Sequence, residues 1–352
     1  MSLSDGLAAL KLQTPPRVPR TEYSVEMHHN LVSAITGMRV DDQTPWPERH
    51  KACHALYRAW KYDLFWNVLI HSGEFGDYRT DMGHAVYADK GADYRPVGKT
   101  LFDDPDKVLA FDPADTFGIP EHANLVKRFS SHYRSACEGW PDGVHMTGIY
   151  VTLISGLIDL LGWDMLLLTA GVDPVGFGDL ANRYARWMQH YFDALAASDA
   201  PVVMIHDDIV WTAGAFIHPD WYRKYVFPNY KRYFQPLQDA GKIILFTSDG
   251  DYTEFLDDVV EVGASGLVFE PLTDMAYFAS KYGKTHSFIG NADTRILLSG
   301  SKMQIRAEVE RCMAIGKKCP GFFMAVGNHI PPNTPVANAL YYNQCYEELS
   351  KR

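Results

Sequence analysis

Five short apolar runs in this chain stop abruptly at polar, chemically reactive residues. The clearest run, residues 243–246, reads Ile-Ile-Leu-Phe and is followed by Thr-Ser-Asp-Gly, which ends at Gly250. A short run rich in β-branched and aromatic residues with such an end predicts a buried strand. The same pattern recurs at residues 202–205, 266–269, 287–289 and 322–326.

Segments with helical spacing separate these runs, which is the alternation expected of βα units on a parallel sheet. Polar residues at the C-terminal ends of successive strands favour a (β/α)8 barrel whose functional site lies at that mouth. A doubly wound sheet is the alternative, but the one Gly-x-Gly-x-x-Ala motif, residues 176–181, follows no predicted strand and does not indicate a nucleotide site. We therefore predict the α/β class, with an N-terminal arm at residues 1–20 and a single TIM-type (β/α)8 barrel at residues 21–352.

Bulk composition narrows the classes of function. The chain has 352 residues, of which 47% are hydrophobic, and this is enough for one large core. Its formal charge of -10 argues against general binding to nucleic acid or to an anionic membrane. The five cysteines include no C-x-x-C pair, which predicts reduced structural thiols.

Two further features bear on location in the cell. The longest apolar stretch, residues 149–170, contains polar residues and glycines, so it predicts a buried helix rather than a membrane span. The N-terminal residues have neither the charged nor the apolar region of a signal peptide. This absence predicts a cytoplasmic protein.

Residues 21–94 are dense in aromatic and histidine side chains. Those of residues 49–65 follow helical spacing, which predicts that most of them belong to the core or to a helix face. Residues 75–91, which include Asp81 and His84 among glycines, are a candidate lid over the barrel mouth. Further helices are predicted at residues 120–139, 174–197, 219–240, 253–262, 274–282, 302–315 and 336–349.

Asp249, Glu270 and His329 follow three different predicted strands, so a closed barrel brings them to one mouth. Two carboxylates and an imidazole suit Zn²⁺ with one open coordination position. This interpretation makes all three residues metal ligands and Asp249 also a catalytic group. The alternative is structural: Asp249 caps the following helix, and Glu270 is a buried acid with a local partner.

The strand at residues 202–205 runs into His206, Asp207 and Asp208. Consecutive side chains of an extended backbone point to opposite sides, so only one of the two aspartates can face the mouth, and His206 shares the side of Asp208. The aspartate that faces the mouth is a candidate base, acid or cation partner, and we assign the general acid–base role to Asp207. His206 and Asp208 are candidate substrate-binding residues.

Two more residues are candidate substrate-binding groups. Tyr150 ends the predicted strand at residues 144–150 and reaches the same mouth. Arg295 follows Asp293 at the start of a predicted helix and is able to reach an anionic substrate, whereas Asp293 itself fits a helix N-cap.

Several stretches of the chain match one known family. They are Arg17-Val-Pro19, His206-Asp-Asp-Ile209, Pro219-Asp-Trp-Tyr222, Thr247-Ser-Asp-Gly-Asp251, Tyr282-Gly283, Gly290-Asn-Ala-Asp293 and Gly327-Asn-His-Ile-Pro-Pro332. On these stretches the chain, from about Arg17 to its C-terminus, resembles the uroporphyrinogen decarboxylase superfamily. Members of that superfamily are (β/α)8 barrels and include corrinoid-linked and coenzyme M methyltransferases.

Two departures from the family pattern narrow the activity that the resemblance implies. True decarboxylases carry an N-terminal segment whose arginines hold the substrate carboxylates, and this chain has Pro19-Arg-Thr-Glu-Tyr-Ser-Val25 there, so porphyrinogen decarboxylation is not expected. Thiol-activating methyltransferases carry His-x-Cys where this chain has Thr247-Ser-Asp249, and a later Cys where it has Asn328 or His329. A zinc site rich in thiolates is therefore not expected.

The resemblance then implies a methyltransferase of the kind found in O-demethylase systems. Such an enzyme uses an oxygen-rich Zn²⁺ site to activate a methyl ether and passes the methyl group to the corrinoid of a partner protein. Two alternatives stay open. One is a decarboxylase or lyase that acts on a small carboxylic acid through Asp207 and Arg295, and the other is a barrel that binds a ligand without turnover.

Overall fold

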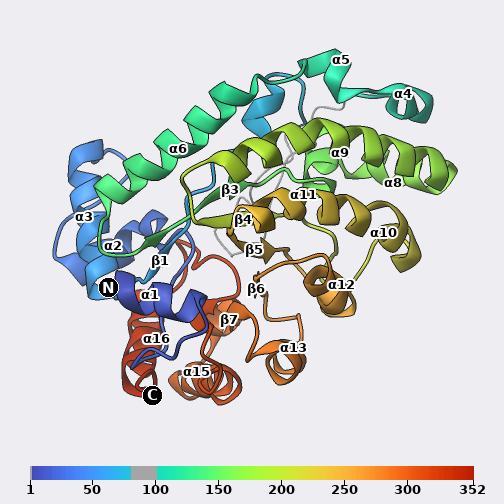
Figure 1. Cartoon of the computed structure of the whole chain (residues 1–352). Coiled ribbons are helices and arrows are strands. Elements are labelled where there is room, and N and C mark those ends of the chain that lie inside the picture. The colour runs from blue at the N-terminus through green and yellow to red at the C-terminus, as the bar shows by residue number, and fades with distance from the viewer. Residues whose placement is uncertain (1, 81–100) are drawn as a thin grey trace.

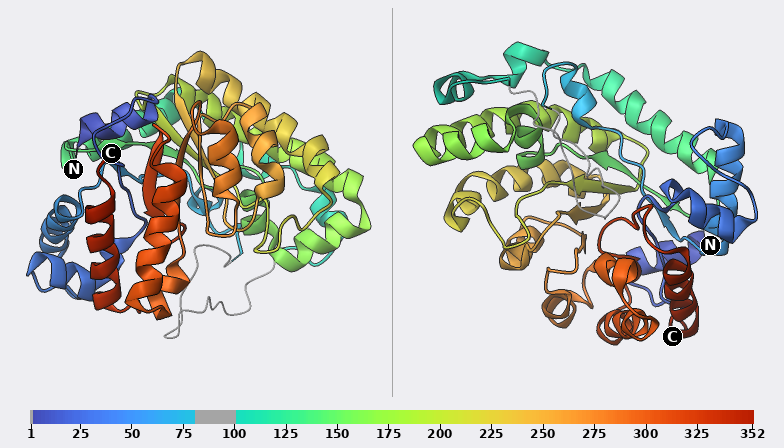
Figure 2. Two further views of the ribbon diagram at one scale, coloured as in Figure 1. Left: turned by 90° about the horizontal axis from the view of Figure 1, so that it is seen from below. Right: turned by 180° about the vertical axis from the view of Figure 1, so that it is seen from behind.

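The computed structural model of the protein describes residues 2–80 and 101–352. Figure 1 shows a central group of strands enclosed by helices, and Figure 2 shows the same arrangement from two further sides. Residues 81–91, which make up most of the candidate lid, lie outside the described residues.

Every named strand pairs in parallel with its neighbour. A six-stranded sheet has the order β3 (Thr147–Ile149), β4 (Val202–His206), β5 (Ile243–Thr247), β6 (Gly266–Val268), β7 (Ser287–Ala292) and β8 (Phe322–Val326). A separate pair joins β1 (Leu64–Phe65) to β2 (Val144–His145). The five strands predicted from apolar runs are confirmed as β4 to β8, because runs without polar interruption need cover on both faces and the barrel provides it.

Residues 19–21 fill the gap between β8 and β1. The Met324 N–H of β8 donates to Pro19 O at 2.8 Å, and the Asp63 N–H beside β1 donates to Arg20 O at 2.8 Å. On the far side of β1, Ile70 forms a parallel bridge with Ile149 at the end of β3. These contacts complete the ring of a (β/α)8 barrel, so the predicted fold class is confirmed.

Helices surround the strands (Figure 1). The first are α1 (Leu3–Leu10), α2 (His29–Thr36), α3 (Trp46–Ala59), α4 (Pro105–Ala110), α5 (Pro113–Phe117), α6 (His122–Gly139), α7 (Ile154–Leu161) and α8 (Trp163–Val172). Next come α9 (Pro174–Ala197), α10 (Pro219–Tyr225), α11 (Phe227–Asp239), α12 (Leu256–Glu261), α13 (Met275–Tyr282), α14 (Thr294–Ser299), α15 (Lys302–Gly316) and α16 (Val336–Leu349). Short 3-10 turns are η1 (Val25–Met27), η2 (Ser72–Phe75) and η3 (Thr253–Phe255).

Two segments predicted as single helices are each divided in two. Residues 149–170 contain α7 and most of α8, which meet at Gly162 and are bent there by 110°. Gly162 has φ 73°, a left-handed conformation that ends helices and favours glycine. Residues 219–240 contain α10 and α11, which separate at Val226 because Pro228 lacks the N–H that a continuous helix would use.

Two other features of the helices bear on the sequence predictions. Within the described residues, no single helix is long and apolar enough to cross a membrane, and α7 and α8 would pass that test only as a bent pair, on length and composition. The Gly-x-Gly-x-x-Ala motif at residues 176–181 lies inside α9 instead of after a strand. It therefore lacks the strand-to-helix turn that a dinucleotide site needs.

The apolar core has two parts. Inside the barrel, alternate side chains of the strands meet, among them Met204, Leu245 and Phe323, and the opposite strand faces pack outward against the helices. Helix α1 adds Ala9 and Leu10 to the inner cluster and so covers the end of the barrel where the strands begin. The predicted N-terminal arm at residues 1–20 thus begins with a core helix, and Pro15, Pro16 and Pro19 all follow it.

We expect Leu10→Ala to lower the free energy of unfolding by about 2–4 kcal/mol, because it leaves a cavity among the inner side chains. Leu10 is 5% exposed, whereas Leu3 on the same helix is 42% exposed and serves as the control. Urea unfolding followed by circular dichroism measures both variants. Equal effects of Leu10→Ala and Leu3→Ala would contradict the placement of α1 at the barrel end.

A candidate active site at the barrel mouth

Three potential metal ligands gather at the C-terminal ends of β4 and β5. One ligand atom from each of His206, Asp208 and Asp249 lies within 4.8 Å of the others. Nε2 of His206 is 3.1 Å from Oδ1 of Asp208. His206 is buried, Asp208 is half-buried and Asp249 is exposed, so the cluster opens to solvent on the side of Asp249.

Two contacts with Tyr150 hold the His206 ring in place. Nδ1–H of His206 donates to Tyr150 O at 3.0 Å, and the two rings stack with centroids 3.6 Å apart and planes 9° apart. A proton held on Nδ1 leaves Nε2, which lies near Asp208, to take either a second proton or a metal ion. Tyr150, a predicted substrate-binding residue, thus orients His206.

Hydrogen bonds from backbone N–H groups join the loops that carry the carboxylates. The Asp249 N–H donates to Oδ1 of Asp208 at 3.0 Å. The Asp208 N–H donates in turn to Ser155 Oγ, in the first turn of α7, at 2.7 Å. The loops after β4 and β5 are therefore tied to each other and to α7, so the two aspartates cannot move apart independently.

Glu270, which follows β6, is held by the same group of loops. The Gly250 N–H donates to its Oε2 at 2.6 Å, and the Asn328 side chain donates to its Oε1. Gly250 has φ 86°, and a Cβ at this position would lie 2.5 Å from Trp211 O. Only glycine fits a backbone with this conformation and this close neighbour.

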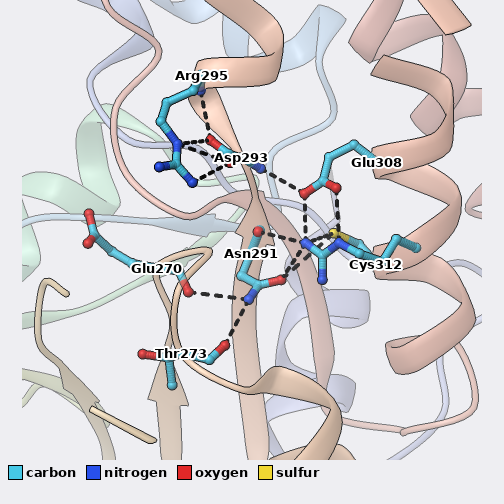
Figure 3. Close-up of polar contacts among 8 residues, drawn as sticks. Glu270, Thr273, Asn291, Asp293, Arg295, Glu308 and Cys312 are labelled. Carbon is cyan, nitrogen blue, oxygen red and sulfur yellow. Dashed lines mark hydrogen bonds and ion pairs between the residues drawn. The ribbon is translucent and has the colours of Figure 1, made fainter. Parts of the chain in front are cut away.

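A polar network around β7 supports the loop that carries Glu270 (Figure 3). The Asn291 side chain donates to Glu270 O at 3.2 Å and to Thr273 O at 3.3 Å. Its Oδ1 accepts from Arg311 at 2.9 Å, and Arg311 donates to Glu308 at 2.9 Å. Asn291 is buried, so these protein partners replace the water that its amide would otherwise bind.

Asp293 and Arg295 form a pair beside this network (Figure 3). Asp293 accepts the backbone N–H of Arg295 at 2.9 Å and caps α14, as the sequence suggested. The guanidinium of Arg295 is 2.7 Å from the Asp293 carboxylate, and its side chain is 69% exposed. Contact between Arg295 and a substrate stays a prediction.

The electrostatics of the cluster favour a bound cation. Burial, together with the nearby carboxylates of Asp208 and Glu270, raises the pKa of Asp249 well above its usual range. Burial also raises the pKa of Glu270. Burial alone would lower the pKa of His206, but the carboxylates of Asp208 and Asp249 outweigh it and raise this pKa to about 9. Asp249 is thus surrounded by protein atoms, although the residue is exposed to solvent.

An aromatic pair borders the cluster. Tyr23 stacks on Trp66 with ring centroids 4.4 Å apart and meets the His329 ring edge-on at 6.4 Å. Burial and the charge of Asp249 raise the pKa of Tyr23 well above its usual range, so the phenol stays protonated. Among the described residues, Tyr23 Oη and Trp66 Nε1 are buried without a hydrogen-bond partner.

The group that the structure brings together differs from the ligand set predicted from the sequence. Asp249 belongs to both, whereas Glu270 and His329 are outside the group of ligand atoms within 4.8 Å of one another. The structural alternative for Asp249 also fails, because Asp251 instead accepts the Thr253 N–H at 3.0 Å. A metal site made by Asp249, Glu270 and His329 stays a prediction.

Asp207 points away from the cluster. Its carboxylate accepts the N–H groups of Ile154 at 3.0 Å and Ser155 at 2.6 Å, at the start of α7, and the hydroxyl of Tyr230. Asp207 is fully buried, and this burial raises its pKa. Because side chains alternate along a strand, Asp208 lies on the side of His206 at the mouth and Asp207 lies on the other side. A catalytic role for Asp207 stays a prediction.

The sequence did not single out Tyr23, but the aromatic-rich region from Tyr23 to Tyr94 was expected to supply an apolar pocket for a methoxylated compound. Tyr23 itself lies in a segment without strand or helix periodicity, and it reaches the mouth because it pairs with His329 beyond the end of β8.

Fold and site together define a (β/α)8-barrel protein whose mouth gathers carboxylates around one buried imidazole. A family model described as uroporphyrinogen decarboxylase (URO-D) matches residues 143–349. The chain belongs to this family of enzymes, as the sequence resemblance predicted.

The chain is also similar to curated relatives in sequence and to a solved structure in fold. The uroporphyrinogen decarboxylase of Pelobacter propionicus is 26% identical over 178 residues, which is 51% of each chain. That of Thermus thermophilus is 30% identical over 171 residues, 49% of this chain and 48% of the relative. The chain thus spans about half the length of the curated relatives it matches. A methyltransferase from Methanosarcina mazei shares the fold, with a TM-score of 0.62 and 17% identity over 99% of both chains.

We expect Asp207→Asn and Asp208→Asn to have different effects. An amide at residue 207 turns one donor toward the N–H groups that now point at a carboxylate, so it should cost about 1–3 kcal/mol of stability. Asp208→Asn removes the carboxylate that does most to raise the pKa of His206, so its cost in stability should be present below pH 6.5 and fade as the pH rises to about 9. Chemical denaturation measures both. Loss of turnover by Asp207→Asn with unchanged stability would restore the catalytic assignment of Asp207.

Proposed function

We propose that the protein is a metal-assisted methyltransferase that takes a methyl group from a small methoxylated compound and delivers it to a corrinoid protein. The observation that carries this proposal is the cluster of His206, Asp208 and Asp249 at the mouth. Methyl transfer from an ether needs a positive centre beside the leaving oxygen, and this cluster is suited to holding one.

The donor set of the cluster fits a divalent cation. One imidazole nitrogen and two carboxylate oxygens are ligands that Zn²⁺ accepts, and catalytic zinc sites keep a further position open. The raised pKa of His206 also supports a cation site. The carboxylates around His206 attract a proton to it, and they would attract a metal cation for the same reason. When bound by His206, Asp208 and Asp249, Zn²⁺ would supply Lewis acidity to the ether oxygen.

Residues of the chain would bind and orient the methyl donor. The stacked rings of Tyr23 and Trp66 form an aromatic wall beside the carboxylates, which suits the ring of a methoxyaromatic compound. Tyr23 Oη and Trp66 Nε1 are donors without partners among the described residues, and a polar ring substituent would satisfy them after a small side-chain adjustment. Tyr150 would keep His206 oriented toward the cluster.

The proposed methyl acceptor is the corrinoid of a separate protein. A reduced corrinoid supplies the nucleophile that attacks the methyl carbon. The accessible carboxylate of Asp249 leaves that face of the cluster open to an approaching partner. We also propose a cytoplasmic location, where the five cysteines, all free, would remain reduced.

Decarboxylation of a small carboxylic acid is the second candidate, because the curated relatives are uroporphyrinogen decarboxylases. The geometry weighs against a substrate with many carboxylates. Arg17 is paired with Asp63, and Arg20 is fully buried and paired with Glu22. Both arginines of the N-terminal segment therefore have internal partners, and the mouth itself is acidic.

Zinc binding at pH 7 should release at least about one proton, because a His206 with a pKa of about 9 is protonated in the metal-free protein and must lose that proton to bind a metal. Calorimetry in buffers with different ionisation enthalpies measures the number released. Binding without proton release would contradict a site that contains His206.

Two variants decide between the two ligand sets. His206→Ala should lower the bound zinc by at least about tenfold, as expected when a direct ligand is lost, and His329→Ala should leave it within about a factor of two. Elemental analysis of protein purified without chelator gives the metal content. The opposite result would favour the set of Asp249, Glu270 and His329.

The activity itself is open to a direct assay. Protein mixed with a reduced corrinoid protein and a panel of methoxyaromatic compounds should consume the absorbance of the reduced corrinoid. Asp249→Asn should slow this reaction by about 10²-fold or more, the scale expected when a group at the reacting centre is lost. If no donor reacts and the protein alone releases CO₂ from a small carboxylic acid, the decarboxylase is the correct function.

A further inference from the structure

Helix α3 has a second face, beside its core face and outside the candidate active site. Its core face carries Ala52 and Leu56. Five other residues of α3, spaced so that they share one side of the helix, line a cavity of about 500 Å³: Trp46, Arg49, His50, Cys53 and Tyr57. Glu26, Thr44 and Trp140 complete its lining, and none of these residues belongs to the carboxylate cluster.

The walls of this cavity are aromatic. His50 lies 4.5 Å from Trp46 and 4.4 Å from Trp140 between ring centroids, and Tyr57 lies 4.9 Å from Trp140. Trp46 is 66% exposed, so a large apolar ring at the entrance is in contact with water. The volume falls in the range of small-molecule sites, and flat rings on several sides favour a planar aromatic ligand.

Arg49 gives the cavity a positive charge. Its Nη2 donates to the carbonyl oxygens of Asp41, Asp42 and Thr44 at 3.4, 3.1 and 3.3 Å, and its buried Nε has no hydrogen-bond partner among the described residues. Within residues 2–80 and 101–352, no carboxylate forms an ion pair with Arg49. A guanidinium held by carbonyls alone keeps its full charge and can bind a carboxylate.

Among the described residues, Glu26 is the one acidic side chain in the lining. Burial raises its pKa, and its carboxyl group is hydrogen-bonded to Tyr57. The Glu26 carboxyl group is thus engaged by Tyr57 instead of Arg49. This arrangement favours an organic anion over an organic cation, although aromatic walls alone would suit a cation.

We propose that this cavity is a binding site for a planar aromatic carboxylate, with the ring held between Trp46, Tyr57 and Trp140 and the carboxylate bound by Arg49. A smaller cavity of about 140 Å³ shares Glu26 and Tyr57 with it and extends to Tyr23 and Trp66. The site thus lies next to the aromatic wall of the barrel mouth. Its existence does not depend on the proposed methyl transfer.

Calorimetric titration of the full chain with benzoate tests the ligand class. Benzamide has the same ring without the charge, and cyclohexanecarboxylate has the same charge without the aromatic ring. Benzoate should bind at least about tenfold more tightly than either, because a charge-assisted pair with Arg49 and ring stacking are both required. Equal binding of benzoate and benzamide, or no benzoate binding at millimolar concentration, would overturn the proposal.

Four variants test the position of the ligand. Arg49→Gln and Trp46→Ala should each weaken benzoate binding by at least about fivefold. Arg39→Gln removes the same charge from a side chain that is 93% exposed, and it should leave binding unchanged. Thermal melting shows whether each variant is folded. Arg49→Gln could also loosen residues 41–44, whose carbonyls Arg49 binds. In that case Trp46→Ala is the decisive test of the ligand position, because Trp46 is mostly exposed and its loss should not disturb the fold. Binding that is lost in Asp249→Asn but kept in Arg49→Gln and Trp46→Ala would place the ligand at the mouth and refute this site.

Discussion

The segment that closes the barrel between β8 and β1 contains a buried ion pair between Arg20 and Glu22, and Glu22 also accepts the N–H of Val326 in β8. Both side chains are fully buried, and 3.0 Å separates Arg20 from Glu22. Three aromatic rings surround the guanidinium at 4.3 to 5.1 Å: Trp60, Tyr342 and Tyr346. A buried charge is costly unless it is paired, so these groups must come together for the fold to form. Through these rings, the segment between β8 and β1 is packed against α16 and the end of α3. The C-terminal ends of the strands converge on one mouth only because the ring is closed.

That convergence has an electrostatic cost at the mouth. Asp208, Asp249 and Glu270 approach one another there, and burial and mutual repulsion raise the pKa of both Asp249 and Glu270. His206 offsets part of this cost by holding a proton. Charged groups that repel one another and lower the stability of the fold are often found at ligand-binding sites. A divalent cation at the cluster would offset the repulsion between the carboxylates.

Strand alternation shows how far the sequence can lead in assigning site residues. His206 and Asp208 are two positions apart in an extended chain, so their common side was predictable. Asp207 was assigned as the acid or base because it ends a strand that faces the mouth, and its carboxylate accepts from the first N–H groups of α7 and from Tyr230. Nothing in the residues near Asp207 indicates that α7 begins against the end of β4. Only the packing of α7 on the barrel reveals that contact.

The sequence by itself determined the parallel barrel, because apolar runs with polar ends and intervening helical periods have few other ways to bury their surface. It also determined that carboxylates and imidazoles would meet at one mouth. Tertiary structure alone decided which of these side chains have ligand atoms within 4.8 Å of one another, since that depends on the position of each strand in the ring. It likewise decided that α1 covers the barrel end and that Tyr23 borders the site. Both results come from contacts between segments far apart in the chain, for which local periodicity carries no signal.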